Sequence, residues 1–173
     1  MKNKLYIIVL ALGFLGLSGP CLYGQGDGEM KITSSAFENN QNMPQRLSCD
    51  GEGVNPELII SGIPEAAKSL ALIVDDPDAP MGTFVHWVVF DIPLVSHIEE
   101  NSSPGKLGAT TAGTGEYVSP CPPSGTHRYF FKIYALDTLL NLKEGISKGA
   151  LEKAMHGHIL AKAELVGLCN RSR

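Results

Sequence analysis

Three runs of apolar, β-branched and aromatic residues limit what this chain can fold into. They are Ser69–Val74, Phe84–Ile92 and Tyr129–Leu136, and the segments between them are rich in proline, glycine and aspartate. Such runs predict strands, and near-continuous apolar runs are typical of strands covered on both faces. The sequence therefore predicts a mostly β domain, and a sandwich of two packed sheets fits better than an open sheet.

Shorter segments complete the predicted domain. Leu58–Pro64 has the composition of another short strand, and Ser147 to about Met155 is the one convincing helix, with Gly157 as its stop signal. His158–Val166 then predicts a last strand, and Asn101–Gly115 predicts a long surface loop. No repeat or linker interrupts this order, so we expect a single domain.

The N-terminus has the pattern of a signal peptide. A short basic region, Met1–Lys4, precedes thirteen largely apolar residues, Leu5–Leu17. This run is shorter than the roughly 20 apolar residues that a membrane-spanning helix needs. We therefore expect residues 1–21 to form a leader, with cleavage between Ser18 and Gly24, and residues 22–173 to form an exported domain in the periplasm or outside the cell.

Charge and core size narrow the class of protein. The chain has 43% apolar residues, enough for one ordinary core, and a formal net charge of −4. Its basic residues are scattered, so no basic patch for nucleic acid is expected.

Export changes how the four cysteines are interpreted, because disulfides form in oxidising compartments. Cys21 follows Pro20, whereas a lipoprotein signal has a small residue directly before the cysteine, so lipid anchoring at Cys21 is the less favoured alternative. The spacing does not match a zinc site. Cys49 and Cys121 lie in loops rich in glycine and proline and are the favoured bridge, although sequence leaves the connectivity open.

Polar side chains gather at the ends of the predicted strands. Pro77 favours an extended Asp76, which would place Asp76 and Asp78 on one side, roughly 6–7 Å apart. His127 and Tyr129 share a strand face, and His86 lies in the strand Phe84–Ile92. Loops meet at strand ends, and sites are usually built there.

Each of these residues also has an ordinary structural interpretation. The Asp-Pro-Asp segment suits a simple turn, His86 could be a satisfied core histidine, and Tyr129 could serve packing. His97 reads as a surface residue, and the pair His156 and His158 is a poor metal site, because a helix-to-strand crossing would splay the rings.

Three motifs that occur in a fixed order in this sequence are together a much more specific signal than any of them alone. Asp76–Pro80 (DPDAP), Val85–Trp87 (VHW) and Pro120–Phe130 (PCPPSGTHRYF) closely resemble the phosphatidylethanolamine-binding protein family, also called the Raf kinase inhibitory protein family, and its bacterial branch in particular. The resemblance extends over nearly the whole exported chain, including Ser48–Gly51 and Gly157–Ala161.

This resemblance implies an antiparallel two-sheet fold with one or two short helices near the C-terminus and a small anion pocket near the surface. It implies binding of phosphate-like groups, including the phosphoethanolamine head of a phospholipid, with no redox cofactor and no obligatory metal. Bacterial relatives suggest a homodimer. The leader and Cys169 depart from the members that inhibit cytosolic kinases. The residues that correspond to the family pocket are Asp76, Asp78, His86, Pro122, His127 and Tyr129.

The chemistry of these residues supports an anion site. The two imidazoles, the Tyr129 hydroxyl and the amides of residues 119–126 can donate hydrogen bonds to phosphate. The carboxylates would hold the imidazoles protonated by raising their pKa, or would receive the ammonium group of a zwitterion. Both roles predict weaker binding as pH rises.

Two other functions remain open. An Asp and His pair could act as acid and base in phosphoester hydrolysis, although the sequence has no Gly-x-Ser-x-Gly, HExxH or P-loop motif. An exported protein of this kind could also inhibit a kinase-like or protease target. We expect a binding protein rather than an enzyme.

Overall fold

The computed structural model describes residues 28–171. The predicted leader and Cys21 lie outside these residues. The described part contains strands, one short 3-10 helix (η1) and one α-helix (α1). Their bounds are β1 Lys31–Thr33, β2 Gln41–Asn42, η1 Gln45–Leu47, β3 Leu58–Ser61, β4 Ser69–Asp76, β5 Phe84–Ile92, β6 His97–Ile98, β7 Lys106–Leu107, β8 Gly125–Leu136, α1 Lys148–Met155 and β9 Ile159–Arg171.

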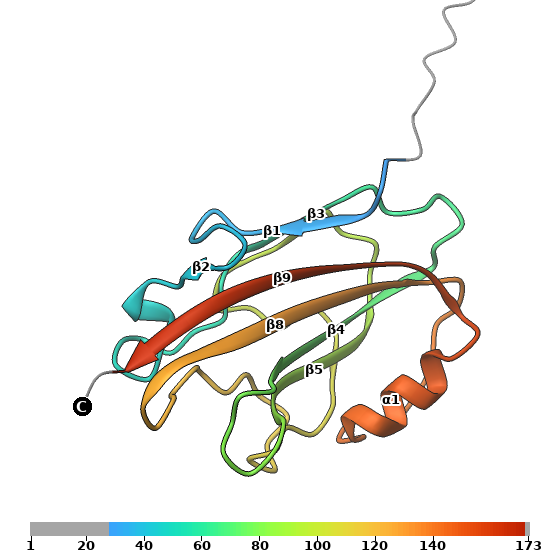
Figure 1. The fold of residues 1–173 in the computed structure, drawn as a ribbon. Coiled ribbons are helices and arrows are strands. Elements are labelled where there is room, and N and C mark those ends of the chain that lie inside the picture. The colour runs from blue at the N-terminus through green and yellow to red at the C-terminus, as the bar shows by residue number, and fades with distance from the viewer. Residues whose placement is uncertain (1–27, 172–173) are drawn as a thin grey trace, which may run out of the picture.

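The strands form two sheets. The small sheet has the order β1-β3-β6, and the large sheet has the order β2-β9-β8-β4-β5-β7. All neighbours are antiparallel except the short pair of β2 and β9, which is parallel. Figure 1 shows the small sheet lying over one face of the large sheet, with α1 on the other side. The predicted two-sheet, mostly β fold is confirmed.

The central strand β4 is buried along its whole length. All eight of its residues are buried, because each face of the strand has its own cover. Leu70, Leu72 and Val74 belong to the core between the sheets, whereas Ala71 and Ile73 pack in a second cluster that includes residues of α1. This explains the continuous apolar run, with one difference from a plain sandwich: the second cover is a helix.

Three predicted strands are longer in the structure than in the sequence analysis. β4 continues to Asp76, β8 begins at Gly125 rather than Tyr129, and β9 continues to Arg171. The extra length of β8 and β9 is in the ladder that pairs these two strands, which starts at Gly125 and Arg171. The extra residues of β4 pair with the start of β5. The first residues of β8 are mostly exposed, so hydrophobicity does not reveal them. The predicted loop Asn101–Gly115 also contains β7, which pairs with β5.

The helix α1 is joined to the sheet by a buried carboxylate. The Asp75 side chain is 1% exposed and accepts hydrogen bonds from the Lys132 ammonium group at 2.8 and 3.1 Å. Lys148, the first residue of α1, also donates to Asp75. The Ser147 side chain caps the helix by accepting a hydrogen bond from the Ala150 amide at 3.2 Å.

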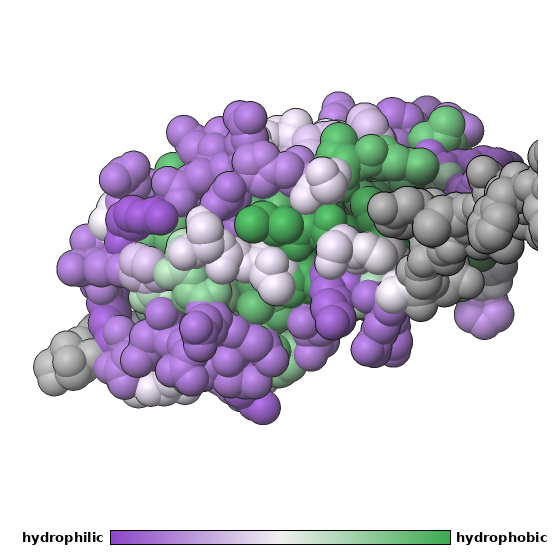
Figure 2. Space-filling model, turned by 90° about the horizontal axis from the view of Figure 1, so that it is seen from above, coloured by the Kyte–Doolittle hydropathy of each residue, from purple (hydrophilic) through white to green (hydrophobic). Residues whose placement is uncertain are grey.

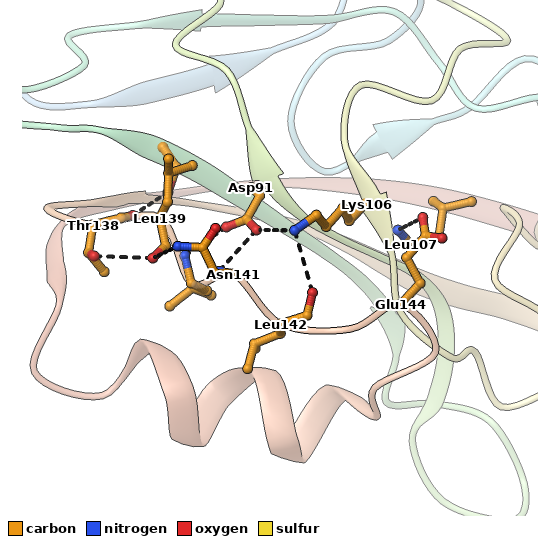
Figure 3. Close-up of polar contacts among 10 residues, drawn as sticks. Asp91, Lys106, Leu107, Thr138, Leu139, Asn141, Leu142 and Glu144 are labelled. Atoms are coloured by element: carbon orange, nitrogen blue, oxygen red, sulfur yellow. Dashed lines mark hydrogen bonds and ion pairs between the residues drawn. The ribbon is translucent and has the colours of Figure 1, made fainter.

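The segment between β8 and α1 is held against β5 by Asp91 (Figure 3). The carboxylate of Asp91 accepts hydrogen bonds from the amides of Leu140 and Asn141 at 2.7 and 3.1 Å, and from the Lys106 ammonium group at 3.0 Å. Asp91 has a φ of 51°, a left-handed conformation that is unfavourable for a residue with a Cβ. These hydrogen bonds offset that cost.

The outer face of the small sheet is not covered by another layer of the described chain. Figure 2 looks onto this side and shows hydrophobic residues gathered in the middle of a largely hydrophilic surface. On β3, Ile59 points outward and is 42% exposed. The middle of this face is therefore less polar than the surface around it.

We expect Leu151→Ala to destabilise the domain by about 3 kcal/mol, because Leu151 is fully buried where α1 packs on the sheet. Chemical denaturation would measure the change in the free energy of unfolding. Lys153→Ala, an exposed position on the same helix, is the matched control and should stay within about 0.5 kcal/mol of the parent. Equal effects of the two substitutions would show that α1 does not depend on its buried face.

Candidate functional site

A cavity of about 260 Å³ lies where β4 ends and where β5 and β8 begin. A larger hollow of about 630 Å³ lies beside β1 and β9, but the smaller cavity is where two imidazoles meet. Five of the six residues predicted from sequence line it, and Asp78 does not. Its lining residues are Asp76, Ala79, Pro80, Phe84, His86, Val118, Ser119, Cys121, Pro122, Pro123, His127 and Tyr129.

Asp76 orients His127. One carboxylate oxygen of this buried residue, Oδ2, lies 2.7 Å from Nδ1 of His127. The other, Oδ1, accepts a hydrogen bond from the Asp78 amide at 2.8 Å, so the simple turn considered from the sequence is present. An ionised carboxylate only accepts hydrogen bonds, so Nδ1 of His127 is the donor. Nε2 of His127 is then left for a ligand.

His86 is held by the loop on the other side of the cavity. Its Nδ1 lies 2.7 Å from the Val118 carbonyl oxygen, which can only accept, so Nδ1 carries the proton. The ring of His86 lies between Phe84 and Tyr129, with centroids 4.7 and 5.1 Å away. In the neutral ring, Nε2 of His86 is therefore a hydrogen-bond acceptor.

Burial lowers the pKa of His86, and the favourable charge of Asp76 does not reverse this. Asp76 does act to raise the pKa of His86, as expected, but burial outweighs it, so the expectation that the carboxylates hold this imidazole protonated is wrong. The reason is depth: His86 is only 5% exposed, and its hydrogen-bond partner is a neutral carbonyl.

Tyr129 forms the inner wall of the cavity. It is 1% exposed, and burial raises the pKa of its hydroxyl. The phenol therefore remains protonated at physiological pH. It can act as a neutral hydrogen-bonding group but not as a base.

Asp78 turns away from the cavity and pairs with Arg128. Its carboxylate accepts hydrogen bonds from Nη2 and Nε of Arg128 at 2.7 and 2.9 Å, and from the Arg128 amide at 3.0 Å. These hydrogen bonds lower the pKa of Asp78 to about 2. The predicted pair of parallel carboxylates does not form, because the turn at Pro77 sends the two side chains in different directions. Sequence reasoning missed Arg128 as the partner.

The loop that carries Pro122 is tied down at several points. The Val118 amide donates to the His86 carbonyl at 2.9 Å, and the Cys49 amide donates to the Pro120 carbonyl at 2.9 Å. The predicted Cys49–Cys121 disulfide is present, with Cα atoms 5.3 Å apart and a sequence separation of 72 residues. Closing a loop of that size is worth about 4 kcal/mol in the chain-entropy model.

The sequence analysis did not single out the apolar wall of the cavity. Several of these residues lie one or two positions from a predicted site residue. That closeness in sequence was the only signal that could have identified them. They line the cavity opposite or beside the imidazoles, so the site has a polar part and an apolar part. The apolar lining residues missed at that stage are Ala79, Pro80, Phe84, Val118 and Pro123.

Within residues 28–171, no three His, Cys, Asp or Glu side chains are grouped as metal ligands would be. None of the helices in the described part of the chain is long and apolar enough to cross a membrane.

The comparisons with known proteins agree on one family. The family model described as phosphatidylethanolamine-binding protein matches residues 33–170. A UPF0098 protein of Pyrococcus horikoshii is 45% identical over 183 residues, which is 99% of this chain and 91% of the relative. A UPF0098 protein of Chlamydia muridarum is 47% identical over 145 residues, covering 80% of this chain and 97% of the relative.

Solved structures have the same fold. A phosphatidylethanolamine-binding protein homolog of Chlamydia trachomatis has a TM-score of 0.81 and 42% identity, covering 83% of this chain and 99% of that chain. Escherichia coli YbcL, described as a new member of the mammalian family, has a TM-score of 0.77 and 27% identity, with the same coverage.

NMR titration of the imidazoles should place the pKa of His86 below its ordinary value of 6.5, because burial disfavours the charged ring. The titration would follow ring carbon-bound protons, with His86→Gln used to assign the resonance. A value for His86 above 6.5 would mean that the carboxylates govern the ring after all.

Proposed function

Because the chain belongs to the phosphatidylethanolamine-binding protein family, we propose that it binds a small ligand through a phosphate group, as in the phosphoethanolamine head of a phospholipid. The observation that carries this proposal is the convergence of two imidazoles on one cavity, each with Nδ1 engaged elsewhere. Both Nε2 atoms are thereby free for the same ligand.

The two imidazoles would hold phosphate in different ways. His127 donates its Nδ1 proton to the Asp76 carboxylate, which fixes the ring and leaves Nε2 for the phosphate. His86 is neutral in the empty cavity, because burial lowers its pKa. It either accepts a hydrogen bond from a protonated phosphate oxygen or takes up a proton. Binding of a fully ionised phosphate is then coupled to proton uptake.

The apolar wall supports an ester rather than a bare ion. Pro80, Phe84 and Pro123 line the cavity beside the imidazoles, where they can contact the organic part of a phosphate ester. Asp78 is paired with Arg128, and both oxygens of Asp76 already accept hydrogen bonds. Asp76 and Asp78 are therefore less suited to bind an ammonium group than the imidazoles are to bind the phosphate.

We also propose that the protein is exported and binds without turnover. The Cys49–Cys121 disulfide supports an oxidising compartment, and the predicted leader agrees with it. The buried Tyr129 hydroxyl has a raised pKa, which makes it a poor nucleophile. The pair of Asp76 and His127 is the one arrangement in the cavity that resembles an acid and base pair.

Calorimetric titration with phosphate and with phosphoethanolamine should show binding to the parent protein. His127→Ala should weaken it about tenfold or more, the cost of one charge-assisted hydrogen bond. The matched control is His97→Ala, because His97 is exposed and pairs with Glu57 on the small sheet. Equal affinities of the parent and His127→Ala would remove the proposal.

The same titrations repeated from pH 8 to pH 6 should show affinity rising as pH falls, because His86 is neutral in the empty cavity, where burial lowers its pKa, and takes up a proton when a fully ionised phosphate binds. Calorimetric titrations in buffers of different ionisation enthalpy should show that the protein takes up protons when phosphate binds. Hydrolysis of a model phosphomonoester that disappears in His127→Ala would instead establish an enzyme.

A further inference from the structure

His86 turns one ring nitrogen, Nε2, to the cavity. Its Nδ1 is engaged with the Val118 carbonyl oxygen, 2.7 Å away, and Nε2 makes no hydrogen bond with the part of the chain that the structure describes. Among residues 28–171, the Tyr117 hydroxyl is the one enclosed side-chain nitrogen or oxygen without a partner. Nε2 of His86 is therefore not enclosed, and it is open to the cavity that the ring lines.

The surroundings of His86 favour a neutral ring. The imidazole lies between the aromatic rings of Phe84 and Tyr129 and is 5% exposed. Its hydrogen-bond partner at Nδ1 is a neutral carbonyl, which can only accept, so Nδ1 carries the proton. In this neutral ring Nε2 has a lone pair and no hydrogen. The group that His86 offers to a ligand is therefore an acceptor.

Charged groups act on His86 from two strands. Asp75 and Asp76 at the end of β4 favour the protonated ring, and His127 on β8 opposes it. Asp76 gives its oxygens to His127 and to the Asp78 amide rather than to His86, and Asp75 pairs with lysines instead. Burial outweighs the two carboxylates and lowers the pKa of His86.

The rest of the cavity wall offers few hydrogen-bond donors. Pro80, Pro122 and Pro123 line the cavity, and proline has no N–H group. The Tyr129 hydroxyl stays protonated, because burial raises its pKa, and it can donate to one ligand oxygen. A ligand that carries a hydrogen of its own therefore complements this wall better than a ligand that only accepts.

We propose that His86 makes the cavity selective for phosphate monoesters over phosphate diesters and sulfate esters. The second proton of a phosphate monoester has a pKa of about 6, so a monoester oxygen can hold a proton and donate it to Nε2 near neutral pH. The oxygens of a diester or a sulfate ester are too weakly basic to carry that proton. They would either face the lone pair of Nε2 or require a charged ring in a buried position, and both are costly.

This selectivity rests on the proposed function and narrows it. The phosphate of an intact phospholipid is a diester, whereas free phosphoethanolamine is a monoester. The free head group is then a better ligand for this cavity than the same head group in a lipid. A monoester that arrives fully ionised takes up one proton as it binds, and the phosphate oxygen shares that proton with Nε2 of His86.

Calorimetric titrations of the parent protein at pH 6 compare ligands of similar shape. Phosphoethanolamine and 2-aminoethyl hydrogen sulfate differ in the central atom, and at this pH about half of the phosphate ester has the same charge as the sulfate ester. Phosphoethanolamine should bind about tenfold or more tightly, because the sulfate ester leaves Nε2 unpaired. Glycerophosphoethanolamine, a diester with the phospholipid head group, should be similarly weak. Either comparison ligand binding as tightly as phosphoethanolamine would overturn the proposal.

Substitution of His86 tests whether this residue sets the selectivity. His86→Gln supplies an amide that can turn an N–H group to the ligand, so the affinities for phosphoethanolamine and the sulfate ester should come within about threefold of each other. His97→Gln is the matched control, the same change at an exposed histidine that pairs with Glu57, and it should keep the parent ratio. Both affinities are measured on one preparation, so a partly unfolded fraction does not alter the ratio. An unchanged ratio in His86→Gln would contradict the proposal.

The outcomes separate this inference from the proposed function. If the parent protein binds neither inorganic phosphate nor phosphoethanolamine, the proposed function is refuted and the inference with it. If phosphoethanolamine binds and the sulfate ester or the diester binds equally well, the inference alone is refuted and the proposed function stands.

Discussion

The complete burial of β4 is the constraint on which the rest of the structure depends. Its side chains alternate between two covered faces, and its last two residues are aspartates. A buried carboxylate is costly unless it is paired and hydrogen-bonded. Asp75, on the helix side, pairs with Lys132 and Lys148, and Asp76, on the side of the small sheet, pairs with His127. One charge thus fastens α1 to the sheet, while its neighbour orients the imidazole of the candidate site.

The same alternation divides the work of β8. His127 and Tyr129 project inward and build the cavity, whereas Arg128, Phe130 and Lys132 project outward. The cations of Arg128 and Lys132 lie 5.5 and 5.3 Å from the centre of the Phe130 ring, close enough for cation–π attraction. Arg128 holds Asp78 of the cavity loop and Lys132 holds Asp75. The outer face of β8 therefore connects the loop after β4, through the pair of Asp78 and Arg128, with the end of β4 itself, through the pair of Asp75 and Lys132.

The cavity is assembled from segments with different kinds of support. His127 and Tyr129 stand on β8, where both are paired with β9, and Asp76 completes the central strand. The loop of residues 118–123 has no strand of its own and relies on two backbone hydrogen bonds and the disulfide. The rigid strands carry the charged groups, and the loop carries His86's carbonyl partner and the apolar wall. A change confined to that loop can therefore alter the cavity while the sheets remain intact.

The sequence by itself determined the features that are local. The runs around β4, β5 and β8 identified the strands through composition, and the segment from Ser147 to about Met155, with Gly157 as its stop signal, identified α1. The order of the motifs also indicated which residues would meet, and five of six do line one cavity. Only the tertiary structure decided the rest, because it depends on strand register and depth. Asp76 and His127 are 51 residues apart in the sequence. Whether Asp76 or Asp78 faces the His127 ring depends on the direction of the turn after β4, which cannot be derived from the sequence of that segment. The lowered pKa of His86 arises from burial, and the contact of Arg171 with the Cys121 sulfur likewise depends on where the end of β9 lies in the assembled fold. These are properties of the assembled layers, and no single segment of the sequence contains them.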